Sequence, residues 1–212
     1  MKCVILTGGE PPERRLLENS LMDAQLIISV DGAADIFYEY GIVPDVLIGD
    51  FDTADEDCVK ALEKRGAKTV VLKAEKNETD TQAAIDYALS AGSDEIRILG
   101  ALGGRLDHLL SNVMMLVRAE NAGAKCSITS KECELYVTDK EFLLFGEQGQ
   151  TVSILPLTGE VCVNATGLKY PLDNLLLEWG SSRGISNIML GGRAHISVSG
   201  GYALIIKNNL NP

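Results

Sequence analysis

The sequence predicts two domains, an α/β N-terminal domain followed by a smaller all-β domain. Over residues 1–138 short apolar runs alternate with helical patterns. This alternation favours a mostly parallel, Rossmann-like sheet with helices on both faces. Over residues 139–212 helical periodicity is absent, and short strand-like runs are separated by Gly, Pro, Asn or Ser. That texture is typical of a β-sandwich.

In the first domain, the expected strands are short runs rich in branched apolar residues. They cover residues 3–6, 26–30, 46–48, 69–72, 96–99 and 125–128. The expected helices lie between them, at residues 12–23, 33–40, 55–65, 79–90 and 107–122. Gly41, Gly66, Gly92 and Gly123 each follow a helical pattern directly, where a left-handed residue commonly ends a helix.

In the second domain, the expected strands are residues 142–145, 151–155, 161–165, 175–179, 194–198 and 202–206. A β domain of roughly 70 residues is near the lower limit for independent stability. We therefore expect it to pack against its neighbour or against a partner chain.

Composition narrows the class of protein. A net charge of −11 argues against a nucleic-acid partner, which would need a basic face. No apolar run approaches the length of a membrane span, so we expect no membrane partner. The five cysteines are scattered and form no C-x-x-C pair, which fits reduced thiols in a cytoplasmic protein.

Two carboxylates on alternate residues, Asp50 and Asp52, follow the third expected strand. We expect the chain to turn at Gly49 and to present both acids at the carboxyl end of the sheet, where open α/β sheets bind ligands. Oxygen ligands of this kind suit Mg²⁺ and its bound phosphates. The alternative is an Asx turn that only caps the helix beginning near Asp55.

Two further acidic turns follow strands. Asp31 and Gly32 lie between a strand and a helix, where glycine permits close approach of a phosphate or sugar, although an ordinary turn has the same pattern. Thr79 with Gln82 is a plausible capping box. Asp80 is then either a first-turn acid favoured by the helix dipole or a member of the same cleft as Asp50 and Asp52.

The loop after the fifth strand, Gly100-Ala101-Leu102-Gly103-Gly104-Arg105, is the hardest to explain as a simple connection. Its three glycines suit a backbone that wraps phosphate, and Arg105 can grip phosphate bidentately. Asp107 either completes a metal-binding set or caps the next helix, whereas we interpret His108 as structural. Four acids at three strand ends would repel one another, and a divalent cation relieves that repulsion.

The second domain offers aromatic, hydroxyl and amide groups that suit a flat heterocycle. They lie in residues 167–172 and 179–187, which include Tyr170, Trp179, Ser186 and Asn187. The alternative is turns in a β domain with an aromatic core.

Taken together and in this order, the motifs resemble the thiamine pyrophosphokinase family. The resemblance spans nearly the whole chain and rests on Asp31-Gly32-Ala33-Ala34, Gly49-Asp50-Phe51-Asp52-Thr53, Glu78-Thr79-Asp80, Gly103-Gly104-Arg105-Leu106-Asp107-His108, Gly167-Leu168-Lys169-Tyr170 and Gly184-Ile185-Ser186-Asn187. It implies an α/β domain, a β-sandwich and a homodimer with active sites shared between subunits. It also implies transfer of the pyrophosphoryl group of ATP to thiamine, which gives thiamine diphosphate and AMP.

The resemblance also implies roles for individual residues. Asp50, Asp52, Asp80 and Asp107 would hold Mg²⁺ and the ATP phosphates, and Asp52, Asp80, Arg105 and Asp107 would carry the catalysis. Asp31, Gly32, Thr79, Gly103, Gly104 and Arg105 would contact ATP. Tyr170, Ser186 and Asn187 would contact thiamine. The family often has tryptophan at the position of Tyr170, so the stacking aromatic is Tyr170 or Trp179.

Two other functions remain open at this point. A sugar-nucleotide glycosyltransferase with an Asp-x-Asp site would explain Asp50 and Asp52 but would leave Asp80 and Asp107 without a role. A non-catalytic thiamine or nucleotide sensor on the same fold would not need all four acids. Formation of AMP from ATP, Mg²⁺ and thiamine distinguishes the pyrophosphokinase from both.

Overall fold

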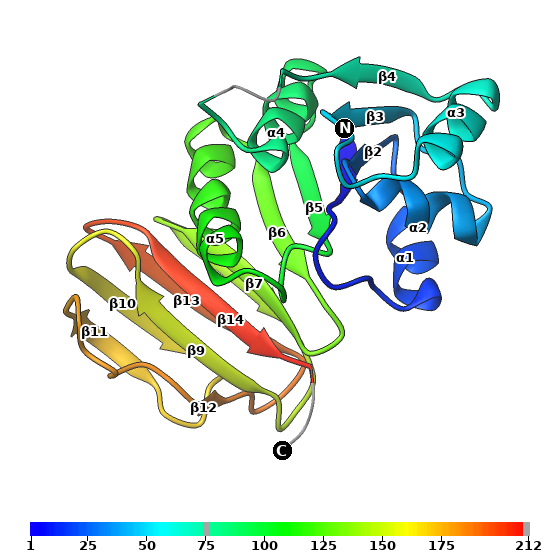
Figure 1. The fold of residues 1–212 in the computed structure, drawn as a ribbon. Helices are drawn as coiled ribbons and strands as arrows, with labels where there is room; N and C mark the ends of the chain where they lie inside the picture. The colour runs from blue at the N-terminus through cyan, green and yellow to red at the C-terminus, as the bar shows by residue number, and fades with distance from the viewer. Residues whose placement is uncertain (74–76, 210–212) are drawn as a thin grey trace. The chain divides into compact units, whose positions relative to one another are not determined.

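The computed structural model describes residues 1–73 and 77–209 and divides into two compact units, Met1–Lys131 and Glu132–Pro212 (Figure 1). The second unit begins before the expected boundary after residue 138, because β7 (Cys133–Thr138) pairs antiparallel with β14 (Ala203–Asn208). Each unit has a hydrophobic cluster of its own.

The first unit contains the predicted strands and helices in the predicted order, with ends shifted by at most two residues. They are β1 (Lys2–Leu6), α1 (Arg14–Leu21), β2 (Leu26–Val30), α2 (Ala33–Tyr40), β3 (Val46–Gly49), α3 (Glu56–Lys64), β4 (Lys68–Val71), α4 (Asp80–Ser90), β5 (Glu95–Leu99), α5 (Leu106–Asn121) and β6 (Lys125–Thr129). The four glycines expected at helix ends all have positive φ, between 72° and 112°.

The strand order in this unit is β6-β5-β1-β2-β3-β4, and every pairing in it is parallel. The chain runs outward from β1 to β4, crosses back to β5 and ends at β6. Successive connections therefore leave β1 and β5 in opposite directions. In an open parallel sheet the carboxyl ends of two such strands form a crevice between their loops, which is the usual place for a ligand.

Right-handed crossovers place α1, α2 and α3 on one face of the sheet and α4 and α5 on the other. Leu17, Phe37 and Leu62, from the first three helices, form one fully buried cluster with Val4 and Leu47 of the strands. On the other side α4 and α5 contact each other (Figure 1). Among the described residues, no helix is both long enough and apolar enough to span a membrane.

The second unit consists of two antiparallel sheets around one core, and this confirms the predicted β-sandwich. One sheet has the order β12-β9-β14-β7 and the other β11-β10-β13-β8. The remaining strands are β8 (Glu141–Phe145), β9 (Thr151–Pro156), β10 (Val161–Thr166), β11 (Leu172–Leu177), β12 (Asn187–Ile188) and β13 (Arg193–Ser199). Both sheets contribute side chains to the cluster, for example Ile154 and Ile205 from one and Val163 and Ile196 from the other.

Three details of this unit differ from the prediction. The sequence pattern did not indicate β7 or the two-residue strand β12. The strand expected at residues 175–179 lies earlier, at Leu172–Leu177. The Trp179 side chain therefore lies outside the strand and is 66% exposed, so it is not part of the core.

Candidate active site

A cleft of about 400 Å³ opens in the first unit where the loops after β1 and β5 meet. The loops are hydrogen-bonded directly, from Gly9 N to Gly100 O at 3.0 Å. A Cβ on Gly9 would lie 2.2 Å from Gly100 O, and a Cβ on Gly100 would lie 2.3 Å from Thr7 O. Only glycine permits this close approach, so the pairing of β1 with β5 requires glycine at both positions.

Main-chain groups dominate one side of the cleft. Gly103 and Gly104, with φ of 81° and 66°, line it together with the loop Thr7-Gly8-Gly9. Asn112 of α5 also lines the cleft, and its Nδ2 donates to Ala101 O at 2.9 Å, which anchors the glycine-rich loop. Backbone N–H groups in left-handed turns of this kind form concave sites for anions such as phosphate.

Three carboxylates lie together at the neighbouring strand ends. Asp31 follows β2, Asp50 and Asp52 follow β3, and each offers an oxygen within 4.8 Å of the others. We had expected the chain to turn at Gly49, but Gly49 is the last residue of β3. The turn comes at Phe51, with φ of 59°, and Gly49 is instead needed for close packing, because its Cβ would lie 3.1 Å from Asp31 Cα.

The charges in this group repel one another. The carboxylate of Asp50 raises the pKa of Asp52, with smaller contributions from partial desolvation and from the charges of Asp31 and Asp80. The Thr53 hydroxyl donates to Asp31 Oδ2, whereas Oδ1 of Asp31 is buried with no hydrogen-bond partner among the described residues. Crowded carboxylates with an unused buried oxygen fit the donor set of a hard divalent cation.

Neither Asp50 nor Asp52 caps α3. The N-cap is Asp55, whose Oδ1 accepts from Asp57 N at 2.8 Å. Asp50 Oδ1 accepts a longer bond from Asp52 N at 3.4 Å, so the Asx-type contact exists but leaves the other carboxylate oxygens available.

Asp80 is both an acid in the first turn of α4 and an acid of the cleft. Thr79 is the N-cap, because its hydroxyl accepts from Gln82 N at 3.2 Å. Asp80 is the first residue of the helix, lines the cleft and is close enough to raise the pKa of Asp52. The capped first turn thus sets the position of an acid that belongs to the cleft.

Asp107 lies apart from the three-carboxylate group. Its oxygens accept from Arg105 Nη2 at 2.7 Å and from Arg105 Nε at 3.2 Å. The guanidinium hydrogen bonds lower the pKa of Asp107 to about 2 and raise the pKa of Arg105. Both side chains are more than half exposed, so the pair is free to rearrange when an anion enters beside Arg105.

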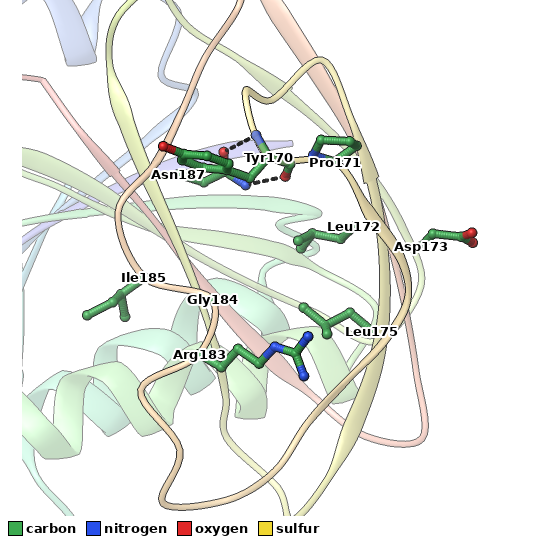
Figure 2. Close-up of a pocket in the computed structure, with 9 residues that line it drawn as sticks. All are labelled: Tyr170, Pro171, Leu172, Asp173, Leu175, Arg183, Gly184, Ile185 and Asn187. Atoms are coloured by element: carbon green, nitrogen blue, oxygen red, sulfur yellow. Dashed lines mark hydrogen bonds between the residues drawn. The ribbon is translucent and has the colours of Figure 1, made fainter.

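The second unit has a cavity of its own, of about 470 Å³. Its walls are residues 170–173 and 175 of one segment and residues 183–185 and 187 of another, as Figure 2 shows. Leu172, Leu175 and the Arg183 side chain point into the space between these segments, and Asp173 points away. An apolar floor with an aromatic rim suits a flat, partly polar ligand.

Comparison with known proteins decides the family. The model of the thiamin pyrophosphokinase catalytic domain matches residues 17–128, and that of the thiamin pyrophosphokinase vitamin B1 binding domain matches residues 132–203. The chain belongs to the thiamine pyrophosphokinase family. The two matches coincide with the two units of the structure.

Individual members of the thiamine pyrophosphokinase family match over the full length. A Bacillus subtilis thiamine pyrophosphokinase is 31% identical over 98% of this chain and 99% of its own. The crystal structure of the B. subtilis enzyme superposes with a TM-score of 0.88 over 99% of both chains, at 29% identity. The structure from Geobacillus thermodenitrificans gives a TM-score of 0.85 at 30% identity, over 98% of this chain and 97% of its own.

The structure distributes the predicted site residues over the two units. In the first unit, the predicted residues that line the cleft are Asp31, Thr79, Asp80, Gly103, Gly104 and Arg105. Asp50 and Asp52 lie with Asp31 in the carboxylate group. Asp107 is paired with Arg105, and Gly32 packs against Thr53. In the second, Tyr170 and Asn187 line the cavity, whereas Ser186 and Trp179 are exposed near it in sequence but not among its walls.

Some lining residues were missed. Thr7, Gly8 and Gly9 were not among the expected site residues, although two glycines close after a strand were a visible signal. Arg183, in a Ser- and Gly-rich loop, gave no signal that distinguishes a cavity wall from an ordinary surface arginine.

Proposed function

We propose that this chain is a thiamine pyrophosphokinase that transfers the pyrophosphoryl group of ATP to the hydroxyl of thiamine and releases AMP. The observation that carries the proposal is that a glycine-lined cleft and a group of crowded carboxylates lie together at the carboxyl ends of the parallel strands. Such a site suits a triphosphate together with Mg²⁺. Family membership supplies the acceptor.

Asp31, Asp50 and Asp52 would hold the metal, since their oxygens converge and the pKa of Asp52 is raised by the negative charge of its neighbours. When bound, Mg²⁺ would neutralise charge on the ATP phosphates and on the departing AMP. The glycine-rich loop and Arg105 would orient the phosphates through N–H groups. Arg105 is available for this because its bond to Asp107 is solvent-exposed and exchangeable.

Loss of the thiamine hydroxyl proton needs an acceptor. Asp80 is the acid that lines the cleft without belonging to the three-carboxylate group, so we assign proton acceptance to Asp80. Asp107 then serves by orienting Arg105 before ATP binds rather than by binding metal, which departs from the expectation that it is a fourth ligand.

Thiamine would bind at the cavity of the second unit, with its heterocycle against Tyr170. The proposal includes a homodimer in which the cleft of one subunit works with the cavity of its partner, and this is supported by the split of phosphate chemistry and heterocycle chemistry between the two units. It also includes a cytoplasmic location, which the five free cysteine thiols support.

The test is to incubate the purified protein with ATP, Mg²⁺ and thiamine and to separate the products by chromatography. We expect thiamine diphosphate and AMP in equal amounts, with neither product formed when Mg²⁺ is chelated. ADP in place of AMP, or nucleotide consumption that does not depend on thiamine, would exclude this reaction. Asp52→Asn, which keeps the shape and removes the charge, is the matched inactive control.

A further inference from the structure

Asn187 is a buried polar side chain at the wall of the second cavity, with only 6% of its surface exposed. Its Oδ1 accepts from Tyr170 N at 3.0 Å and its Nδ2 donates to Tyr170 O at 2.6 Å (Figure 2). The same Oδ1 also accepts from Ile188 N at 2.9 Å. An amide oxygen has two acceptor sites, and both are filled here. A substrate would have to break one of these bonds to donate to Asn187.

These bonds extend a short strand pairing. Leu168 forms an antiparallel bridge with Met189, and Lys169 N donates to Ile188 O at 2.8 Å. The next residue along the first segment is Tyr170. Its main-chain N–H and C=O therefore need partners at the point where the pairing ends.

The opposite segment turns away at that point. Ser186 has φ of 59°, and its N–H donates to Ser153 Oγ at 3.1 Å instead of pairing with the segment of Tyr170. The side-chain amide of Asn187, which lies opposite Tyr170 in this register, accepts from the N–H of Tyr170 and donates to its C=O. It reproduces the two bonds that a main-chain partner would make in an antiparallel pair.

Because Asn187 holds the main chain of Tyr170, it also limits the position of the exposed Tyr170 ring. The Tyr170 side chain is 57% exposed at the rim of the cavity, and the ammonium of Lys169 lies 5.5 Å from its ring centroid. Few contacts hold such a ring by itself, so its position depends on the backbone that carries it. A stacking surface is useful to a ligand only if it is already in place before binding.

We propose that Asn187 is a positioning residue, which acts on thiamine through the main chain of Tyr170 and does not contact the substrate through its amide oxygen. This rests on the proposed function and changes the role expected for Asn187 from substrate contact to support. In this proposal Tyr170 contacts thiamine, and Asn187 determines the position of the Tyr170 ring.

A double-mutant cycle tests the proposal. Asn187→Ala removes the support, Tyr170→Ala removes the ring, and the two changes are also combined in one chain. For Asn187→Ala we expect the KM for thiamine to rise about tenfold, as loss of the hydrogen bonds to the main chain of Tyr170 implies, with the KM for ATP unchanged. In the Tyr170→Ala background the second substitution should add nothing, because its effect passes through the missing ring.

Asn164→Ala is the matched control. Asn164 lies in the same unit, and its Oδ1 also accepts from a main-chain N–H, that of Asn174, at 2.8 Å. It does not line the cavity. We expect this variant to lose some thermal stability and to keep the wild-type KM for thiamine. An equal rise in both variants would reduce Asn187 to a structural residue and overturn the proposal.

Amide hydrogen exchange measured by NMR supplies a readout that does not depend on turnover. Asn187→Ala should accelerate exchange of the Tyr170 amide. Asn187→Asp, which can still accept from that N–H but places an oxygen next to Tyr170 O, should accelerate it less and also serves if the alanine variant fails to fold. Additive effects in the cycle, or unchanged exchange at Tyr170, would refute the positioning role. Failure of the proposed function is distinguishable, since the wild type would then form no thiamine diphosphate at all.

Discussion

Replacing Gly100 by alanine tests whether the contact between the β1 and β5 loops shapes the cleft. Gly100 has φ of 70°, and a Cβ there would lie 2.3 Å from Thr7 O, which is main chain and cannot rotate away. Gly104 is the control in the same loop, since it has φ of 66° and nothing lies within 4 Å of its Cβ. Both variants carry the left-handed strain, and only one carries the clash.

The magnitudes follow from that difference. A left-handed alanine costs about 1–2 kcal/mol, so Gly104→Ala should lower the free energy of unfolding by about that amount. Gly100→Ala adds an overpacking cost of about 1–3 kcal/mol, for a total of about 2–5 kcal/mol. Relief of the clash would have to separate Thr7 from Gly100 and so weaken the bond from Gly9 N to Gly100 O.

Urea unfolding followed by far-UV circular dichroism measures the effect on the first unit, because the described helices all belong to it. The slope of the transition should be unchanged in both variants. The KM for ATP should rise in Gly100→Ala, where the loop main chain must move. Equal destabilisation in the two variants, or a larger effect at Gly104, would refute the argument.

Four other outcomes are expected. Because neighbouring charges raise the pKa of Asp52, protonation of this carboxyl stabilises the folded protein, and the stabilisation is lost as the pH rises through the raised pKa. In metal-free buffer at neutral pH, Asp52→Asn should therefore raise Tm. The increase in Tm should become smaller in acid. The same variant should lose the increase in Tm that Mg²⁺ gives the wild type, and no Mg²⁺ effect in the wild type would contradict the metal site. Asp80→Asn should keep that increase but lose about 10²–10⁴-fold in kcat, and near-normal turnover would remove Asp80 as proton acceptor. Verified heterodimers of Asp52→Asn and Tyr170→Ala chains should regain activity, since one of their two sites carries neither defect; no gain over either parent homodimer would place each site within one subunit.

The sequence predicted the first unit well because its signals are local. Strand residues are apolar and branched, helix ends carry glycine, and the cap at Thr79 is read from four consecutive residues. Left-handed turns were harder. We had expected the chain to turn at Gly49, whereas the positive φ falls on Asp31 and Phe51. Gly32 and Gly49 are instead needed for space, because a Cβ at either position would lie about 3 Å from Thr53 or Asp31.

What the sequence could not give are contacts between segments that are far apart in the chain. Thr7 and Gly100 face each other only because β1 lies beside β5, and strand order leaves no local mark. The same applies to Asn187. Its motif suggested a ligand contact, whereas its partners are the main chain of a residue in another segment, at Tyr170.

The place of β14 has a consequence for how the second unit is made. β14 lies between β7 and β9, so the last described strand is an inner strand of its sheet and not an edge. During synthesis β7 and β9 emerge first and cannot hydrogen-bond each other across the space that β14 will fill. This sheet can close only after Ala203–Asn208 has left the ribosome, and until then two strand edges remain open to other chains. A stop codon just before Ala203 would thus leave both edges open and the whole unit prone to aggregation.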